Sequence, residues 1–434
     1  MVFQETSLGA DSERVTKAAA EAGLDSSRSE PVELAPAEEP RLDGVRIAMI
    51  NWRDPWQSVA GGAEEYAWRI SQHLTGRGAD VTFLTSREPG QDRRETVRGV
   101  AFCRMGGRFT VYLWVFLWLL LRRRRFDLAL DCMNGVPFFS RLALPRRIPV
   151  VSVVHHVHDL QFCAYFSRPL ARIGRFVEGP LASRVYRSCP TVTVSESSRR
   201  AMREKLGWKA PISVIHNGSP VAVRGDGDPE DHGSTGVPPG VRVPPAAPPR
   251  EEMGTPAIVS LGRLVVQKRV ARLVDVVAEL GEEWPGLRAH IVGRGPQQEP
   301  VAERARELNV TDRVVLHGFL PDDQRDAVLA GARLHVTASE FEGWGLTVIE
   351  AAALGVPTVA YDVDGLRDSV RDGVTGWLVR EGESLTAAVD RALHELADPH
   401  RAAEVSQACR AWAASFTWER SGREMTWLLA GLVK

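Results

Sequence analysis

Short apolar runs rich in β-branched residues alternate with longer stretches of mixed polar and apolar residues along most of the chain. The short runs are typical of strands buried on both faces, and the longer stretches, such as 64–74, 268–280 and 297–308, are typical of amphipathic helices. In the first half we expect strands at 45–50, 81–84, 100–104, 128–131, 150–154, 191–194 and 212–215. In the second half we expect strands at 257–261, 288–292, 314–316, 334–337, 358–361 and 377–379. This order predicts an α/β fold with parallel sheets covered by helices.

A proline-rich segment divides the alternating pattern into two halves. Nine of the 27 prolines fall between residues 220 and 256, and neither a helical nor a strand period continues through them. We therefore predict a linker or long surface loop at 220–256, an N-terminal domain at 45–219 and a C-terminal domain at 257–434. We expect two doubly wound, Rossmann-like domains facing across a cleft, with ligands outside the carboxyl ends of the strands.

Charge changes the picture at the start of the chain. Residues 1–44 carry ten acidic and four basic residues and a single aromatic residue. Because this segment has too few apolar side chains to build a core, we predict a disordered acidic leader. Its charge of −6 masks a charge of +5 on the rest of the chain, and the total of −1 disfavours a dedicated nucleic-acid-binding protein.

Two further features bear on the cellular location. The start of the chain lacks the basic stretch and apolar run of a secretory signal. The five cysteines lie far apart with no CxxC pair, which is typical neither of a disulfide framework nor of a zinc module. We therefore expect a cytoplasmic protein whose cysteines are buried and reduced.

The segment 109–121 holds no charged residue and is followed by four arginines at 122–125. A helix of this length extends about 20 Å, which is shorter than the roughly 30 Å hydrocarbon core of a bilayer. Two interpretations stay open. The helix at 109–125 either lies on an anionic membrane, at the inner face of the plasma membrane, or is a buried helix of the first domain with solvated arginines.

Candidate chemistry in the second half centres on residues 339–353, which follow an expected strand. The backbone freedom of Gly345 and a helix starting at Leu346 would expose amides that bind an anion. Glu342 and Glu350 flank this turn, so the ligand is expected to carry both hydroxyl and phosphate groups. The simpler interpretation is an acid that stabilises a helix N-terminus and a second, solvated acid.

Positive charge is available at the same sheet edge. Arg263 and Lys268 follow the expected strand at 257–261, and both side chains suit phosphate oxygens. Gly293 opens a glycine turn after the strand at 288–292, which is consistent with room for a flat base. Taken alone, each of these features is equally well explained by solvated cations and an ordinary loop.

In the first half, glycines 61 and 62 precede an expected helix, and three histidines follow the strand at 150–154. His155, His156 and His158 lack a matching set of cysteines or carboxylates nearby, so we do not expect a metal site. One of them, at the end of a strand, is expected to face the cleft.

Together these segments resemble the retaining glycosyltransferases of family 4, which have the GT-B fold. The resemblance covers about residues 45–434 without the linker. It is carried by the E-x7-E pattern of Glu342 and Glu350 and by four motifs: GGAE at 61–64, GRLVVQK at 262–268, VGRGP at 292–296 and EGWGLTVIEAAALGVP at 342–357. Arg269 departs from the family, which commonly has glycine at this position.

The resemblance implies roles for individual residues in the second half. Arg263 and Lys268 would hold the diphosphate of a nucleotide-sugar donor and stabilise the leaving group. Glu342 would bind hydroxyls of the donor sugar, and Glu350 the ribose. Further donor contacts would come from Gly293, Gly345, Leu346 and Thr347.

In the first half, the resemblance implies that Gly62 approaches the phosphates or the acceptor. The family's catalytic-region histidine matches His155 best, and His158 is the second choice. The last helix is a candidate to pack back on the N-terminal domain.

We therefore expect a metal-independent, cofactor-free transfer of a sugar to a hydroxyl acceptor, with retained anomeric configuration. The DxD pattern of Asp362 and Asp364 is not expected to bind a metal. A lipid-linked carrier, a polysaccharide and a small natural product stay open as acceptors, as do the donor nucleotide, its sugar and the oligomeric state. Two alternatives remain: a non-catalytic nucleotide-sugar-binding partner in glycan assembly and a sugar-phosphate synthase of the same fold.

Overall fold

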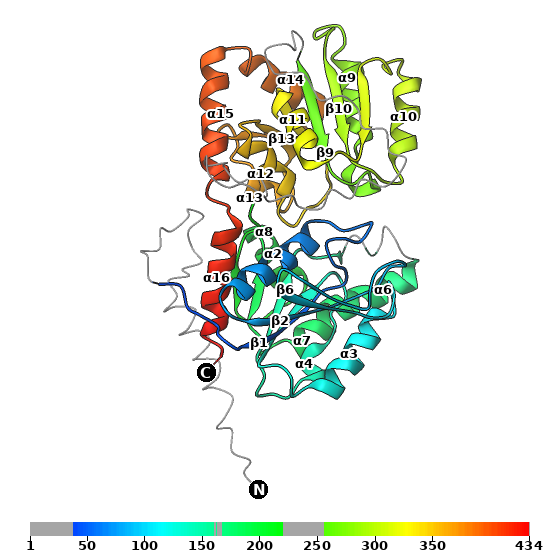
Figure 1. Cartoon of the computed structure of the whole chain (residues 1–434). Helices are drawn as coiled ribbons and strands as arrows, with labels where there is room; N and C mark the ends of the chain where they lie inside the picture. The colour runs from blue at the N-terminus through cyan, green and yellow to red at the C-terminus, as the bar shows by residue number, and fades with distance from the viewer. Residues whose placement is uncertain (1–37, 160–161, 163–166, 220–255, 434) are drawn as a thin grey trace. The chain divides into compact units, whose positions relative to one another are not determined.

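The computed structural model describes residues 38–159, 162, 167–219 and 256–433, which form two compact units, each built on a mainly parallel sheet (Figure 1). The first unit contains the described residues up to Gly218 and the segment that begins at Trp418; the second runs from Ser219 to Thr417. Residues 1–37 of the predicted leader and residues 220–255 of the predicted linker lie outside the described residues.

The sheet of the first unit has the strand order β3-β4-β2-β1-β5-β6-β7-β8. Its strands are β1 Arg46–Ile50, β2 Asp80–Thr85, β3 Arg94–Val97, β4 Val100–Arg104, β5 Leu128–Met133, β6 Val150–Val154, β7 Thr191–Thr193 and β8 Ile212–Val214. All neighbours pair in parallel except β3 and β4. The seven predicted strands are confirmed, whereas β3 was missed because this edge strand is largely exposed and has no apolar run.

Helices connect the strands of the first unit and include the end of the chain. They are α2 Gly62–Gly76, α3 Val111–Arg122, α4 Ser140–Ala143, α6 Arg168–Phe176, the π-helical turn η1 Val177–Leu181, α7 Ala182–Val185, α8 Glu196–Lys205 and α16 Trp418–Ala430. The last helix, α16, packs on α2, where a Cβ added to Gly422 would lie 2.2 Å from the His73 ring. The segment after residue 417 therefore completes the first unit.

The prediction of disorder up to residue 44 is wrong for residues 38–44, which pack on the first unit. Leu42 is only 3% exposed, and Glu39 Oε1 lies 2.6 Å from His73 Nε2 on α2. Arg77 adds an ion pair with Glu39 and accepts a backbone hydrogen bond from Leu42, and the high density of acidic residues obscured these contacts.

The sheet of the second unit is wholly parallel, with the strand order β11-β10-β9-β12-β13-β14. Its strands are β9 Ala257–Leu261, β10 Arg288–Val292, β11 Val314–Gly318, β12 Leu334–Thr337, β13 Thr358–Tyr361 and β14 Gly376–Val379. Its helices are the 3-10 turn η2 Val266–Lys268, α9 Ala271–Glu279, α10 Gln298–Glu307, α11 Asp322–Gly331, α12 Leu346–Ala353, α13 Leu366–Ser369, α14 Leu385–Glu395 and α15 Pro399–Ala413. The six predicted strands are confirmed.

One predicted helix is divided. Lys268 was expected to open a helix at 268–280, but it ends the short turn η2, and α9 begins at Ala271. Arg269 separates the two because its backbone is left-handed, with φ 46° and ψ 38°. A residue in this conformation ends a right-handed turn.

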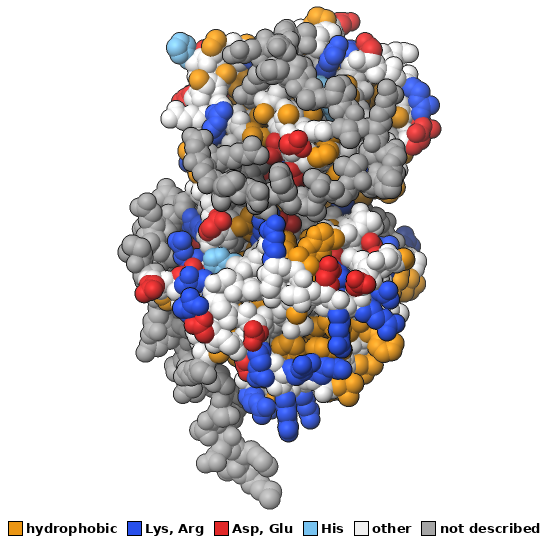
Figure 2. Space-filling view, in the orientation of Figure 1, with side chains coloured by type: hydrophobic (Ala, Val, Ile, Leu, Met, Phe, Trp, Pro, Cys, Tyr) orange, Lys and Arg blue, Asp and Glu red, His pale blue; other side chains and the backbone are white. Residues whose placement is uncertain are grey.

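The apolar segment at 109–121 forms the surface helix α3, which combines features of both interpretations. Val111, Val115 and Leu119 are buried at helical spacing, whereas Leu113 and Leu121 are 59% and 79% exposed. Figure 2 shows apolar and Lys or Arg side chains gathered over the part of the first unit where α3 lies in Figure 1. Among the described residues, no helix has both the length and the apolar character needed to cross a membrane.

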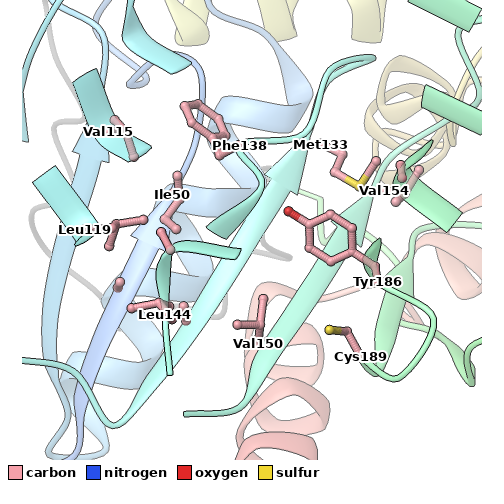
Figure 3. Packing of buried hydrophobic residues seen from close by; sticks show 14 of the residues in the cluster. Ile50, Val115, Leu119, Met133, Phe138, Leu144, Val150, Val154, Tyr186 and Cys189 are labelled. Atoms are coloured by element: carbon pink, nitrogen blue, oxygen red, sulfur yellow. The ribbon is translucent and has the colours of Figure 1, made fainter. Parts of the chain in front are cut away.

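The core of the first unit lies between its sheet and the helices that cover it. Figure 3 shows Val115 and Leu119 of α3 beside Ile50 of β1, with Tyr186 above the neighbouring strands. Mainly apolar strands such as β6 are buried over their whole length, as expected for strands covered on both faces.

Each sheet has a position where the chain reverses its direction of strand addition. In the first unit, β1 is followed by β2 on one side and later by β5 on the other. In the second unit, β10 follows β9 on one side and β12 lies on the other. In parallel sheets, ligands bind outside the carboxyl ends of the strands at such a switch point. A ligand site is therefore expected at the loops that follow β1 and β5 in the first unit and β9 and β12 in the second.

Candidate functional site

An ion pair joins the loops that follow β9 and β12 at the switch point of the second unit. Lys268 Nζ donates a hydrogen bond to Glu342 Oε1, which also accepts one from Ser339 Oγ at 2.8 Å. The side chains of Lys268 and Glu342 are 21% and 17% exposed, so both are held in place yet reachable from solvent. The structure thus brings together two residues that are 74 positions apart in the sequence.

The turn after Glu342 leads directly into a helix N-terminus. Gly345 precedes α12 with φ 86°, and a Cβ at this position would lie 3.0 Å from the side chains of Leu366 and Ser369. Leu346 and Thr347 form the start of α12, where the amides of the first turn have no partner within the helix and the helix dipole is positive. This geometry can hold an anion beside Lys268.

Glu350 lies within α12 and is buried, with 9% of its surface exposed. Burial lowers the pKa of Arg325 on α11. The negative charges near it, of which Glu350 has the largest effect, outweigh burial and raise the pKa overall. Arg325 therefore provides positive charge that compensates the buried carboxylate.

Gly293 has a packing role that the sequence did not reveal. A Cβ at Gly293 would lie 1.8 Å from the carbonyl oxygen of Gly262, so the loops after β9 and β10 can touch only through glycine. Arg263 follows Gly262 and is exposed, and its guanidinium makes no hydrogen bond or ion pair with any described residue. Arg263 is therefore available to a ligand at the edge where Lys268 lies.

Arg269 links the loops after β9 and β12 by its side chain. Its Nε donates a hydrogen bond to the carbonyl oxygen of Ala338 at 2.8 Å, and its guanidinium lies 4.7 Å from the centroid of the Tyr361 ring. Arginine therefore adopts here the left-handed backbone that glycine would adopt most readily, and two side-chain contacts offset the strain.

At the switch point of the first unit, two amides meet across the sheet. Asn134 Nδ2, after β5, donates a hydrogen bond to Asn51 Oδ1, after β1, at 2.9 Å. Gly62 begins α2 beside this edge and is partly exposed. Glu64 fixes the preceding loop by accepting hydrogen bonds from the Gly61 amide at 2.8 Å and from Arg53 Nε at 3.1 Å.

The histidines after β6 have different environments. His155 is 5% exposed, its ring lies edge-to-face with Tyr66 at 5.1 Å, and its Nε2 has no hydrogen-bond partner among the described residues. Burial lowers the pKa of His155 to about 3, so it is neutral. His158 instead places Nδ1 3.0 Å from Glu178 Oε1 and packs its ring against Gly135, where a Cβ would be 3.3 Å away.

Glu178 was missed by the sequence reasoning. It lies 20 positions after His158 in an unpatterned part of the chain, and no motif distinguished it from a solvated acid. The structure shows a buried carboxylate, so the signal existed only in the tertiary contact.

Asp362 and Asp364 both contact Arg367. Arg367 Nε donates a hydrogen bond to Asp362 Oδ1 at 2.8 Å, and Arg367 Nη1 lies 3.7 Å from Asp364 Oδ1. Both carboxylates of the DxD pattern are therefore ion-paired with the same arginine.

Comparison with known proteins gives two family matches that together span most of the chain. Residues 60–223 match Glycosyltransferase Family 4, and residues 247–409 match Glycosyl transferases group 1. Glycogen synthase of Mycobacterium tuberculosis is 28% identical over 407 residues, which cover 86% of this chain and 92% of that protein.

Two more similarities add to this. The GDP-mannose-dependent alpha-(1-6)-phosphatidylinositol monomannoside mannosyltransferase of Mycolicibacterium smegmatis is 34% identical over 213 residues, which cover 45% of this chain and 56% of that protein. The structure of sucrose-phosphate synthase from Thermosynechococcus elongatus superposes with a TM-score of 0.69 at 20% identity, covering 89% of this chain and 98% of that chain. The structural similarity shows a shared fold.

Proposed function

The chain is a family 4-like glycosyltransferase with the GT-B fold, and from this premise we propose that it transfers a sugar from a nucleoside diphosphate sugar to a hydroxyl group, with retained anomeric configuration and without a metal ion. The observation that carries the proposal is the Lys268–Glu342 pair beside the N-terminus of α12. A cation and a helix N-terminus suit the diphosphate, and a carboxylate suits sugar hydroxyls.

The chemistry follows from where charge develops. When the bond between the sugar C1 and the diphosphate oxygen breaks, negative charge grows on the diphosphate and positive charge on the sugar ring. Lys268, Arg263 and the first amides of α12 would stabilise the negative charge. The acceptor hydroxyl then forms the new bond to C1, and its proton passes to the departing diphosphate. Because the protein supplies the positive charge, a divalent cation is not required.

We expect the purified protein to turn over one class of donor from a panel of UDP-, GDP-, ADP- and dTDP-sugars, and to do so equally well in EDTA. Nucleotide release measures turnover, and proton NMR of the product gives its anomeric configuration. Binding without turnover of any donor would favour the non-catalytic alternative. Loss of activity in EDTA with recovery on adding Mn²⁺ would rule out the metal-free mechanism, and an inverted anomer would rule out retention.

We further propose that the enzyme acts at the cytoplasmic face of a membrane on a lipid-linked acceptor, and that α3 makes the contact. The exposed leucines of α3 and the exposed arginines at 123–125 form an apolar surface with a cationic end, and residues 109–125 include no acid. This combination suits the interface of an anionic bilayer. The Mycolicibacterium relative is named for a phospholipid acceptor, which supports the same class here.

Changing Leu113 and Leu121 together to serine is expected to weaken binding to phosphatidylglycerol-containing vesicles by about tenfold or more, because each exposed leucine contributes on the order of 1 kcal/mol when buried in the interface. Vesicle co-sedimentation measures the binding. Both leucines are exposed, so the melting temperature should not change. Phe319→Ser is the control, because it removes a 46% exposed apolar side chain from the second unit. Equal binding by the double variant and the wild type would remove α3 as the contact.

A further inference from the structure

Glu178 is a buried carboxylate that the proposed chemistry has not yet used. It lies in the π-helical turn η1 and is 1% exposed. Its Oε1 accepts a hydrogen bond from the backbone amide of His158 at 2.8 Å and lies 3.0 Å from His158 Nδ1, while its Oε2 has no hydrogen-bond partner among the described residues. Burying a half-satisfied carboxylate is unfavourable, and π-helical turns are frequent at functional sites. Stability alone therefore gives no reason for an acid here.

His158 connects this carboxylate to the switch point of the first sheet. Its ring packs against Gly135, which follows β5 and has φ 83°, and is tilted by 31° against the His156 ring, with ring centroids 3.9 Å apart. Gly135 adjoins Asn134, which bonds to Asn51 at the end of β1. The imidazole of His158 therefore lies at the edge where a ligand of the first sheet would bind.

We propose that Glu178 is a positioning residue that fixes Nδ1 of His158 and so presents Nε2 to a hydroxyl oxygen of the bound ligand. The proposal rests on the glycosyl transfer proposed above and names the histidine that serves it. The proposal therefore assigns this role to His158 in preference to His155, whose ring faces Tyr66. A carboxylate that orients one imidazole nitrogen fixes the tautomer and the direction of the other.

The proton shared by the pair determines what Nε2 can do. Burial raises the pKa of Glu178 to about 8, and burial lowers the pKa of His158 to about 4. Between these values the pair is neutral, with one proton between Oε1 and Nδ1, so Nε2 carries a hydrogen and donates. Above pH 8 that proton is lost, the remaining hydrogen moves to Nδ1, and Nε2 can no longer donate.

The other charged and titratable groups around the pair come from the loop after β6 and from α6. His155 and His156 precede His158 in the loop after β6, and Asp159 follows it. Asp159 raises the pKa of Glu178 further by its charge, but it is itself paired with Arg175 of α6. Burial lowers the pKa of His155 to about 3, so this ring stays neutral where Glu178 titrates, and we assign the alkaline change to Glu178.

Glu178→Gln tests the proposal because glutamine keeps the shape and cannot ionise. We expect kcat to fall by about 10- to 100-fold with KM for the donor within about twofold. We expect wild-type kcat to decline above about pH 8 and the variant to lack this decline. Glu424→Gln is the matched control, since Glu424 is another carboxylate of the first unit whose pKa is raised by burial. It should keep the wild-type pH profile.

A double variant shows whether Glu178 acts through His158. His158→Gln combined with Glu178→Gln should be no slower than His158→Gln alone, because both changes remove the same interaction. Additive losses, or a Glu178→Gln profile equal to that of the wild type, would overturn the proposal.

Nitrogen-15 NMR of the histidine rings tests the Glu178–His158 pair independently of turnover. In the wild type, the His158 signals should change from the Nε2-protonated to the Nδ1-protonated form near pH 8, and they should not do so in Glu178→Gln. This change without turnover of any donor would refute the proposed function and leave the pair intact. Its absence from the wild type would refute the pair even in an active transferase.

Discussion

Replacing Lys268 by alanine is expected to lower kcat/KM for sugar transfer by about 100- to 1,000-fold, the range typical for removing one group that stabilises developing negative charge. Lys268 Nζ bonds to Glu342, so the change also releases the carboxylate proposed to hold the sugar. The free energy of unfolding should change by no more than about 1 kcal/mol, because a partly exposed ion pair contributes little. Initial rates with a saturating acceptor measure the effect.

Two further variants make this test specific. Arg272→Ala removes a cation four positions later, from an exposed side chain whose partner is Asp275, and should leave the rate unchanged. Lys268→Arg retains the charge and should recover part of the loss. If Lys268→Ala transferred sugar at the wild-type rate, the diphosphate site would have to lie elsewhere.

Changing Gly293 to alanine is expected to destabilise the second unit by about 3–5 kcal/mol, which combines the cost of a strained backbone with that of overpacking. The added Cβ would lie 1.8 Å from the Gly262 carbonyl oxygen, and this neighbour is backbone that cannot rotate away. Urea unfolding followed by hydrogen exchange in the peptides of the second unit measures the change.

A substitution at Gly262, which contacts Gly293, distinguishes the cost of backbone strain from the cost of steric overlap. Gly262 also has a positive φ, of 141°, but a Cβ there would meet nothing within 4 Å. Gly262→Ala should therefore cost only the strain, about 1–3 kcal/mol. Equal losses for the two variants would show that the close approach of the two loops adds nothing to the cost.

Buried strands were predictable from the sequence because a strand covered on both faces is apolar over most of its length, as β6 is. The edge strand β3 could not be predicted in this way, because it pairs on one side only and is largely exposed, and therefore has no apolar run. The division of the helix at 268–280 depends on the left-handed backbone of Arg269, and arginine gives no local sign of that conformation. Its side-chain contacts with Ala338, Glu340 and Tyr361, which the structure alone reveals, help to explain it.

Part of the candidate site was predictable because the order of the strands determines which loops meet at one edge of a parallel sheet. Lys268 and Glu342 follow two strands, and parallel strands bring their carboxyl ends to one edge, where the structure joins the two side chains. His155 and His158 were not separable by pattern, because both follow the same strand within four positions. Their difference lies in what surrounds each ring, and for His158 this is Glu178, which belongs to a distant turn.

The return of α16 to the first unit has a consequence for recombination. The chain passes from the first unit to the second at Gly218 and back at Trp418. A chimaera that joins this first unit to the second unit of a relative therefore needs two junctions, because a single junction would leave α2 packed against a foreign last helix. Gly422 against His73 is the contact such a chimaera must preserve. Exchange of the second unit between relatives therefore requires the replacement of an internal segment, not of everything that follows one point in the chain.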